Sequence, residues 1–332
     1  MVTMTPVEIP DAEYERLEAI LTNTIVPPAP LKARFRALFT LKSVQSNRAV
    51  DIISKAFNDP SALLRHELAY VLGQMKNAHA IPVLNSVLAD LKEDCMVRHE
   101  AAEALGAIGE ERSIETLQPY LDPSVELVRE VRETAELAIE RIRYEASQRL
   151  RGLPVQGESV AYTSIDPAPA LDDAELAAPR EETAGQKIKK LSTREVGAIL
   201  MDTTLPLFMR YKAMFALRNR GDTEAVLELA NGFADESALF RHEIAYVFGQ
   251  MQHEASVPSL ITTLSNEGEQ AMVRHEAAEA LGSIATPECF EVLEKFKADG
   301  AQVVQESCVV GLDMAEFEVS GNFQYAERVE TV

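Results

Sequence analysis

The chain has 332 residues with an ordinary share of apolar (46%) and charged (26%) side chains, enough for two compact units with a sizeable hydrophobic core. Its net charge of −21 repels phosphate backbones and anionic lipid, so we expect neither nucleic-acid nor membrane-surface binding. No apolar run reaches the ~18 residues needed to cross a bilayer, and three cysteines (Cys95, Cys289 and Cys308) without a paired motif predict a reducing, cytoplasmic setting.

The first half reads as a series of helices separated by prolines and turn signals. Apolar residues at helical spacing predict helices over residues 8–24, 31–41, 49–57, 61–75, 83–91 and 96–106. The pattern of 61–75 returns at 96–106, and a degenerate copy follows with Glu133 at the histidine position. Helix pairs with a period of 30-odd residues indicate an α-solenoid, and among such repeats the HEAT-like type fits best.

The second half repeats the first at an offset of 176 residues. Residues 237–251 match 61–75 at 12 of 15 positions, and 272–282 match 96–106 at all 11. A terminal degenerate copy again has glutamate, Glu306, at the histidine position. We therefore expect an all-α fold in which HEAT-like helix pairs form two pseudo-symmetric halves.

A change in composition separates the two halves. Residues 147–185 contain four prolines among small and acidic residues, without sustained periodicity, and this predicts a flexible linker. The expected organisation is an N-terminal half over 1–146, the linker over 147–185 and a C-terminal half over 186–325. The last residues, 321–332, are expected to fray.

Four of the six histidines occupy equivalent places in this repeat pattern. Each lies in an Arg-His-Glu triplet, with 33 residues between triplets of one half and 176 between the halves; the histidines are His66, His99, His242 and His275. Neighbouring repeats stack equivalent helices roughly 8–10 Å apart, so side chains at equivalent positions can share one ion. Imidazole binds Fe, Zn, Cu or Ni, and two histidines plus one carboxylate suit non-haem Fe(II). The pattern therefore predicts a metal site from each half.

Spacing alone does not divide the four glutamates that follow the histidines. Successive helical residues point about 100° apart, so some glutamates can bind metal while others face a substrate. The alternative to a metal site is that one ancestral triplet on a solvated surface was copied by duplication and has no metal-binding role. Against it, the residues around the triplet differ between neighbouring repeats while the triplet itself does not. His79 and His253 lack equivalent partners and are expected at the surface, and the triplet arginines are expected to pair with acids.

Duplicated HEAT-like repeats with four His-Glu pairs, two in each half, resemble the deoxyhypusine hydroxylase family. The stretches that carry this resemblance are Leu-Arg-His-Glu-Leu-Ala-Tyr-Val-Leu-Gly-Gln-Met (64–75) and Val-Arg-His-Glu-Ala-Ala-Glu-Ala-Leu-Gly (97–106). The resemblance covers nearly the whole chain, with both halves in order.

The resemblance implies a non-haem di-iron monooxygenase that uses dioxygen and an external reductant. Its substrate would be the deoxyhypusine side chain of eukaryotic translation initiation factor 5A, which it converts to hypusine. By matching position, the iron ligands would be His66, His99 and Glu100 for one ion and His242, His275 and Glu276 for the other. Glu67 and Glu243 would engage the cationic amine chain. Two other classes stay open from the residues: a metal-free scaffold, and a hydrolase with zinc or two metals.

Overall fold

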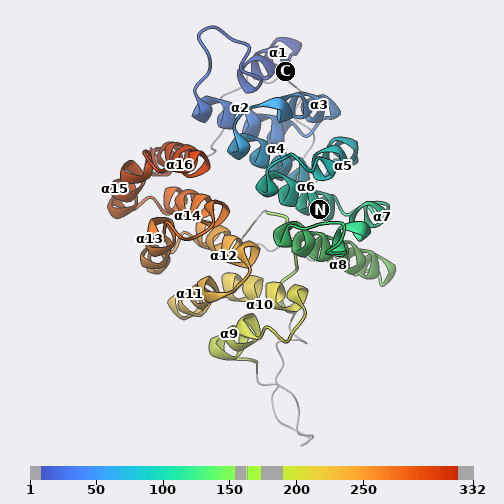
Figure 1. The fold of residues 1–332 in the computed structure, drawn as a ribbon, viewed down its shortest axis with the longest axis vertical. Helices are drawn as coiled ribbons and strands as arrows, with labels where there is room; N and C mark the ends of the chain where they lie inside the picture. Colours follow the sequence, from blue (N-terminus) through green and yellow to red (C-terminus); the bar gives the residue numbers. More distant parts are fainter. Residues whose placement is uncertain (1–8, 154–161, 163, 173–189, 321–332) are drawn as a thin grey trace, which may run out of the picture.

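The computed structural model describes residues 9–153, 162, 164–172 and 190–320 (Figure 1). Within these ranges the chain forms α-helices and short 3-10 helices and no strand, which confirms the expected all-α fold. None of the described helices is both long enough and apolar enough to traverse a bilayer. The cysteines are free, as expected.

The N-terminal half stacks helix pairs from top to bottom in Figure 1. Its helices are α1 (Asp11–Leu21), α2 (Leu31–Val44), α3 (Asn47–Lys55), α4 (Ala62–Gln74), α5 (Ile81–Ala89), α6 (Cys95–Ile108), α7 (Ser113–Leu117) and α8 (Arg129–Leu150). Four of them, α2, α4, α6 and α8, pack side by side as an inner row, and the shorter α3, α5 and α7 lie outside it.

The C-terminal half repeats this arrangement. Its helices are α9 (Thr193–Met201), α10 (Leu207–Arg220), α11 (Thr223–Ala230), α12 (Ala238–Met251), α13 (Val257–Ser265), α14 (Ala271–Ile284), α15 (Pro287–Phe296) and α16 (Gln302–Ser320). The bounds of α10 and α14 are those of α2 and α6 moved by 176 residues. The inner row here is α10, α12, α14 and α16. Two pseudo-symmetric halves are thereby confirmed.

The two inner rows meet at both ends and close into a ring. α8 packs against α10 and α12, and α16 packs against α2 and α4. At one junction the Ser237 hydroxyl donates to Glu133 (2.5 Å), and at the other the Ser61 hydroxyl donates to Glu306 (2.6 Å). These are the glutamates that replace histidine in the degenerate repeats, so the sequence difference marks the helices that join the halves.

Small residues let the inner helices approach closely. A Cβ atom at Gly73 of α4 would lie 2.8 Å from Cα of Ala104 in α6, so any larger residue would push the two helices apart at this crossing. Ser61 and Ser237 cap the N-termini of α4 and α12 by accepting from the backbone amides of Leu64 and Phe240. The caps and the close crossings together fix the positions of His66 and His242, which lie just over one helical turn after Ser61 and Ser237.

Part of the expected linker is packed against both halves. Residues 147–150 are the last turn of α8. The wall segment, which we define as Tyr162 and residues 164–172, carries Asp166, whose side chain bonds Arg218 of α10 and whose carbonyl accepts from Arg141 of α8. The rest of the linker and the expected frayed end lie outside the described residues, and the domain boundaries stay predictions.

Candidate metal centre

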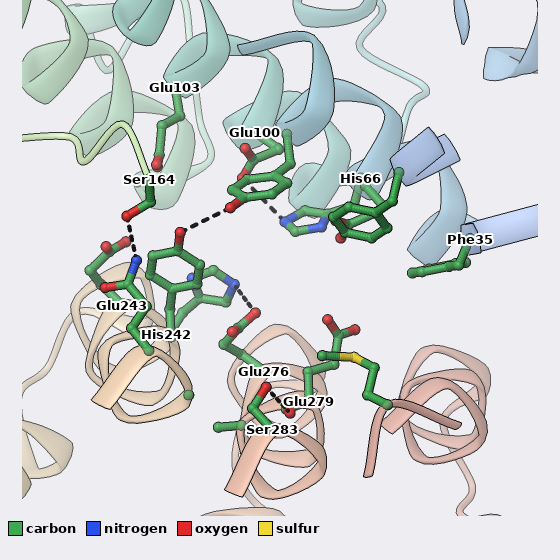
Figure 2. Close-up of a pocket in the computed structure, with 18 of the residues that line it drawn as sticks. Phe35, His66, Glu100, Glu103, Ser164, His242, Glu243, Glu276, Glu279 and Ser283 are labelled. Atoms are coloured by element: carbon green, nitrogen blue, oxygen red, sulfur yellow. Dashed lines mark hydrogen bonds and ion pairs between the residues drawn. The ribbon is translucent and has the colours of Figure 1, made fainter. Parts of the chain in front are cut away.

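Four histidines meet where the inner helices of the two halves face each other. Figure 2 shows one from each half, His66 and His242. α4 and α6 supply His66 and His99, with ring centroids 5.6 Å apart, and α12 and α14 supply His242 and His275, 5.4 Å apart. Across the halves, His66 lies 5.2 Å from His275, and His99 lies 5.4 Å from His242. The four rings therefore form one cluster rather than two separate pairs.

All four imidazoles are buried and chemically unsatisfied. Neither ring nitrogen of any of them has a hydrogen-bond partner among the described residues. Burial, with neighbouring imidazoles, lowers the pKa of His242 to about 3 and the pKa values of His99 and His275 well below the usual range. At His66 burial also lowers the pKa, but Glu100 and other carboxylates outweigh it and raise the pKa overall. Buried imidazole nitrogens without hydrogen-bond partners are suitable metal ligands, so this donor set fits a transition metal.

Carboxylates reach the histidines from the neighbouring repeat. Glu100 Oε2 lies 3.3 Å from His66 Nε2, and Glu276 Oε2 lies 3.4 Å from His242 Nε2, in both cases without the geometry of a hydrogen bond. Candidate ligand atoms of His66, His99 and Glu100 lie within 4.8 Å of one another. The structure thus brings together the three residues expected for the N-terminal ion.

The C-terminal residues are grouped differently from the expected set. His275 and Glu276 come together with Glu279, while His242 and His275 come together with His66 of the other half. His275 Nδ1 is 3.5 Å from Glu279 Oε1. Glu279 is therefore an additional candidate ligand.

Glu67 and Glu243 line a cleft of about 520 Å³ beside the histidines. Burial raises the pKa of both carboxyls well above the usual range, and nearby carboxylates add to the effect, chiefly Glu279 at Glu67 and Glu103 at Glu243. Glu243 Oε1 has no hydrogen-bond partner among the described residues. Buried acids of this kind are ready to receive a cation, because a positive charge would offset their repulsion and lost hydration.

A tyrosine pair joins the halves within the cleft. The hydroxyls of Tyr70 in α4 and Tyr246 in α12 lie 3.1 Å apart, and the two residues occupy equivalent positions 176 residues apart. Burial raises the pKa of both phenols above the usual range. Both hydroxyls are therefore neutral at neutral pH, and they share one hydrogen bond across the pseudo-two-fold axis.

The sequence expectations for the triplet arginines and for His79 are confirmed, whereas His253, expected at the surface, is half-buried. Each triplet arginine pairs with an acid: Arg65 with Glu93, Arg98 with Glu126, Arg241 with Glu269 and Arg274 with Asp299. His79 is exposed and pairs with Asp51 at 2.7 Å. His253 accepts from the backbone amide of Ala255, in a turn after α12. Neither histidine lines the cleft.

Comparison with known proteins places this site in a family. HEAT repeats match residues 50–140 and 223–313, and a PBS lyase HEAT-like repeat matches 209–235, which confirms the expected repeat type. Deoxyhypusine hydroxylase of Candida albicans is 50% identical over 330 residues, covering 96% of this chain and 98% of the relative. The chain belongs to the deoxyhypusine hydroxylase family.

Other members of the deoxyhypusine hydroxylase family give the same result. The human protein is 48% identical over 316 residues, covering 95% of this chain and 96% of the relative. The solved structure of human deoxyhypusine hydroxylase, in complex with glycerol, has a TM-score of 0.78 at 47% identity and covers 92% of this chain and 98% of that one. The ring architecture described above is thus that of a deoxyhypusine hydroxylase.

Two further carboxylates line the cleft, and the sequence analysis did not predict either of them as a site residue. Glu103 and Glu279 line the cleft and lie three residues after Glu100 and Glu276, on the same side of α6 and α14. Their 176-residue spacing within an identical stretch was a signal for them. They were missed because neither follows a histidine directly.

Proposed function

We propose that this chain hydroxylates the deoxyhypusine side chain of eukaryotic translation initiation factor 5A to give hypusine. The reaction would use two non-haem iron ions, dioxygen and an external reductant, in the cytoplasm. One observation carries the proposal: eight imidazole nitrogens without hydrogen-bond partners among the described residues lie buried beside carboxylates, next to the cleft of a deoxyhypusine hydroxylase family member. This donor set suits iron, since two histidines and a carboxylate are typical ligands of oxygen-activating non-haem Fe(II).

The residues that would hold iron come from four inner helices. One ion is assigned His66, His99 and Glu100. The other is assigned His242, His275 and Glu276, with Glu279 close enough to join them. When bound, the iron pair would supply the activation of dioxygen for insertion of an oxygen atom into a C–H bond. The protein contributes a fixed, water-poor pocket, because each of these four histidines is at most 5% exposed.

Glu67 and Glu243 would hold the amine chain of the substrate. Both carboxylates are buried, at 7% and 2% exposure, and both face repulsion from other acids. An ammonium group that donates to them forms charge-assisted hydrogen bonds and relieves this repulsion. The acidic surface, with net charge −21, would also steer a cationic target towards the cleft.

The test combines metal content with turnover on the modified factor. Freshly purified protein should contain about two irons per chain by elemental analysis, a count set by the two sets of histidine and carboxylate ligands. It should also add one oxygen atom to the deoxyhypusine form of the factor, by mass spectrometry. His99→Ala should lose iron and turnover, whereas Glu67→Ala should keep iron and lose substrate binding. His253→Ala is the matched control, since this histidine lies outside the cleft, and it should change neither.

Three results would contradict the proposal. Turnover by His99→Ala or by Glu67→Ala at the wild-type rate would remove the assigned roles. Zinc instead of iron in the active protein would favour a hydrolase. No metal after reconstitution with iron, combined with intact binding of a protein partner, would favour a scaffold.

A further inference from the structure

The two ends of the cleft differ, although the helices that build them are related by the pseudo-two-fold axis. Position 42 at one end corresponds to position 218 at the other, and the residues there are Lys42 and Arg218. Each is cationic, but each is used differently. The difference determines where a positively charged ligand can be bound, and this argument rests on the proposed function.

At the first end the protein supplies its own cation to the acids. Lys42 Nζ lies 5.3 Å from the ring centre of Tyr70 and close enough to Glu67 for their charges to interact favourably. This end is also the one open to solvent: among the described residues that line the cleft, only Glu318 of α16 is exposed. Phe39 of α2 lines the same end. We call this the mouth of the cleft.

At the second end the equivalent cation is held away from the cleft acids. Arg218 forms a bidentate ion pair with Asp166 of the wall segment (2.8 and 2.7 Å) and donates to Gln250. The other nearby arginine, Arg141, uses its two terminal nitrogens on Glu145 and on the Asp166 carbonyl. Tyr162 and Ser164 of the wall segment line the cleft at this end, which we call the closed end. The same segment keeps both guanidinium groups occupied.

Two carboxylates at the closed end have no hydrogen bond or ion pair to a cation within the described residues, although the charge of Arg141 acts favourably on Glu103. Glu243 from α12 is 2% exposed, and its Oε1 has no hydrogen-bond partner among the described residues. Glu103 from α6, in the opposite half, lines the same end and makes no hydrogen bond or ion pair within the described residues. Figure 2 shows Glu103 and Glu243 gathered beside Ser164 of the wall segment, with Phe35 at the other end of the view. Glu279, the pseudo-symmetric counterpart of Glu103, accepts a hydrogen bond from the Ser307 hydroxyl and contacts His275.

We propose that the cleft binds its diamine substrate in one direction, with the terminal ammonium between Glu103 and Glu243 at the closed end. The secondary ammonium of the same chain then lies nearer Glu67, and the attached protein stays outside the mouth. A primary ammonium has three donors and no branch, so it suits a closed end with two acceptors from opposite walls. Glu103 is thereby a specificity-determining residue, because it recognises the distal ammonium group at the end of the aminobutyl chain, which a shorter lysine side chain cannot bring to the closed end and a monoamine does not have.

The test compares two small amines on wild-type protein with matched iron content. N-pentyl-1,4-diaminobutane carries both ammonium groups of the substrate chain, and N-butylpentylamine lacks the terminal one. Isothermal titration should give a preference for the diamine of about 10- to 100-fold, as expected for one added hydrogen-bonded ion pair. Glu103→Gln, which keeps shape and removes charge, should reduce this preference to about two-fold or less and leave the monoamine affinity unchanged.

Glu318→Gln is the control, since it removes a carboxylate from the mouth of the cleft and leaves the closed end unchanged. It should preserve the ratio between the two amines. Glu103→Asp, which retracts the carboxylate by one methylene, should reduce the ratio only in part, and melting curves establish that each variant is folded. Equal losses for both amines in Glu103→Gln, or a lost preference in Glu318→Gln instead, would overturn the proposal. So would a wild-type protein that binds both amines equally.

The outcome is separable from that of the proposed function. Iron content and turnover on the deoxyhypusine factor are measured on the same wild-type preparation. Protein that prefers the diamine through Glu103 but has no hydroxylase activity would retain the directional site and lose the proposed reaction. Active protein whose preference does not depend on Glu103 would retain the reaction and lose the directional site.

Discussion

Replacing Gly73 by alanine tests how closely the metal-bearing helices must approach. A Cβ atom there would lie 2.8 Å from Cα and 3.0 Å from Cβ of Ala104, well inside the separation of about 3.5–4.0 Å at which carbon atoms pack. At the equivalent Gly249 the new atom would meet Cα and Cβ of Ala280 at 3.2 and 3.4 Å. The same substitution in nearly the same sequence thus requires a larger separation of α4 from α6 than of α12 from α14.

The magnitudes follow from two opposing effects. Alanine favours a helix over glycine by about 1 kcal/mol, while overpacking costs about 1–3 kcal/mol. Gly73→Ala should therefore lower the free energy of unfolding by about 1–2 kcal/mol, and Gly249→Ala should change it by less than about 0.5 kcal/mol. Because α6 carries Glu100 and α4 carries His66, Gly73→Ala should also retain less iron.

The assay is urea unfolding of the metal-free variants, followed by circular dichroism, with iron retention measured separately after reconstitution. Equal effects of the two substitutions would show that the helices can separate without cost. A greater loss in Gly249→Ala would refute the reasoning outright, because its contacts are the longer ones.

Three further predictions concern buried charge and the joints of the ring. Glu306→Ala removes the acceptor of the Ser61 hydroxyl and should cost about 1–2 kcal/mol in unfolding free energy; an unchanged urea midpoint would contradict a role in closing the ring. Burial raises the folded-state pKa of Glu243, so metal-free wild type should lose stability as pH rises from the unfolded-state pKa through the folded-state value. Glu243→Gln should be more stable than wild type at neutral pH and show a flatter stability profile, measured by melting across pH; a steeper profile would refute this. Asp166→Ala leaves the Arg218 guanidinium, 1% exposed, without its carboxylate and should cost about 3–5 kcal/mol; thermal unfolding within error of wild type would show that the ion pair is replaced by water.

The sequence was most informative where the repeat pattern is regular. Apolar spacing predicted the helices, and the 176-residue offset predicted the pairing of His66 with His242 as equivalent positions. The closed ring was not predictable, since it depends on α8 and α16, whose repeats are degenerate. Glu133 at a histidine position suggests a repeat that has lost its function, yet this glutamate accepts a hydrogen bond from the Ser237 hydroxyl across the junction.

The sequence also could not predict where individual side chains point or which hydrogen-bond partners they have. Glu103 and Glu279 stand at equivalent positions in identical stretches, but only Glu279 has Ser307 beside it. The wall segment was the hardest to foresee, because prolines and small residues without periodicity are typical of a flexible linker. Its packing comes from Asp166, which two arginines from different helices hold in place.

The placement of the wall segment has a consequence for how such a site can arise. A homodimer of the half-length unit would have strict two-fold symmetry, so both ends of its cleft would be identical and a diamine would bind equally well either way round. Fusion of the two copies into one chain adds a connecting segment that exists only once and can occupy only one end. Gene duplication within a single chain thus supplies what self-association of identical chains cannot, a polar axis along the groove.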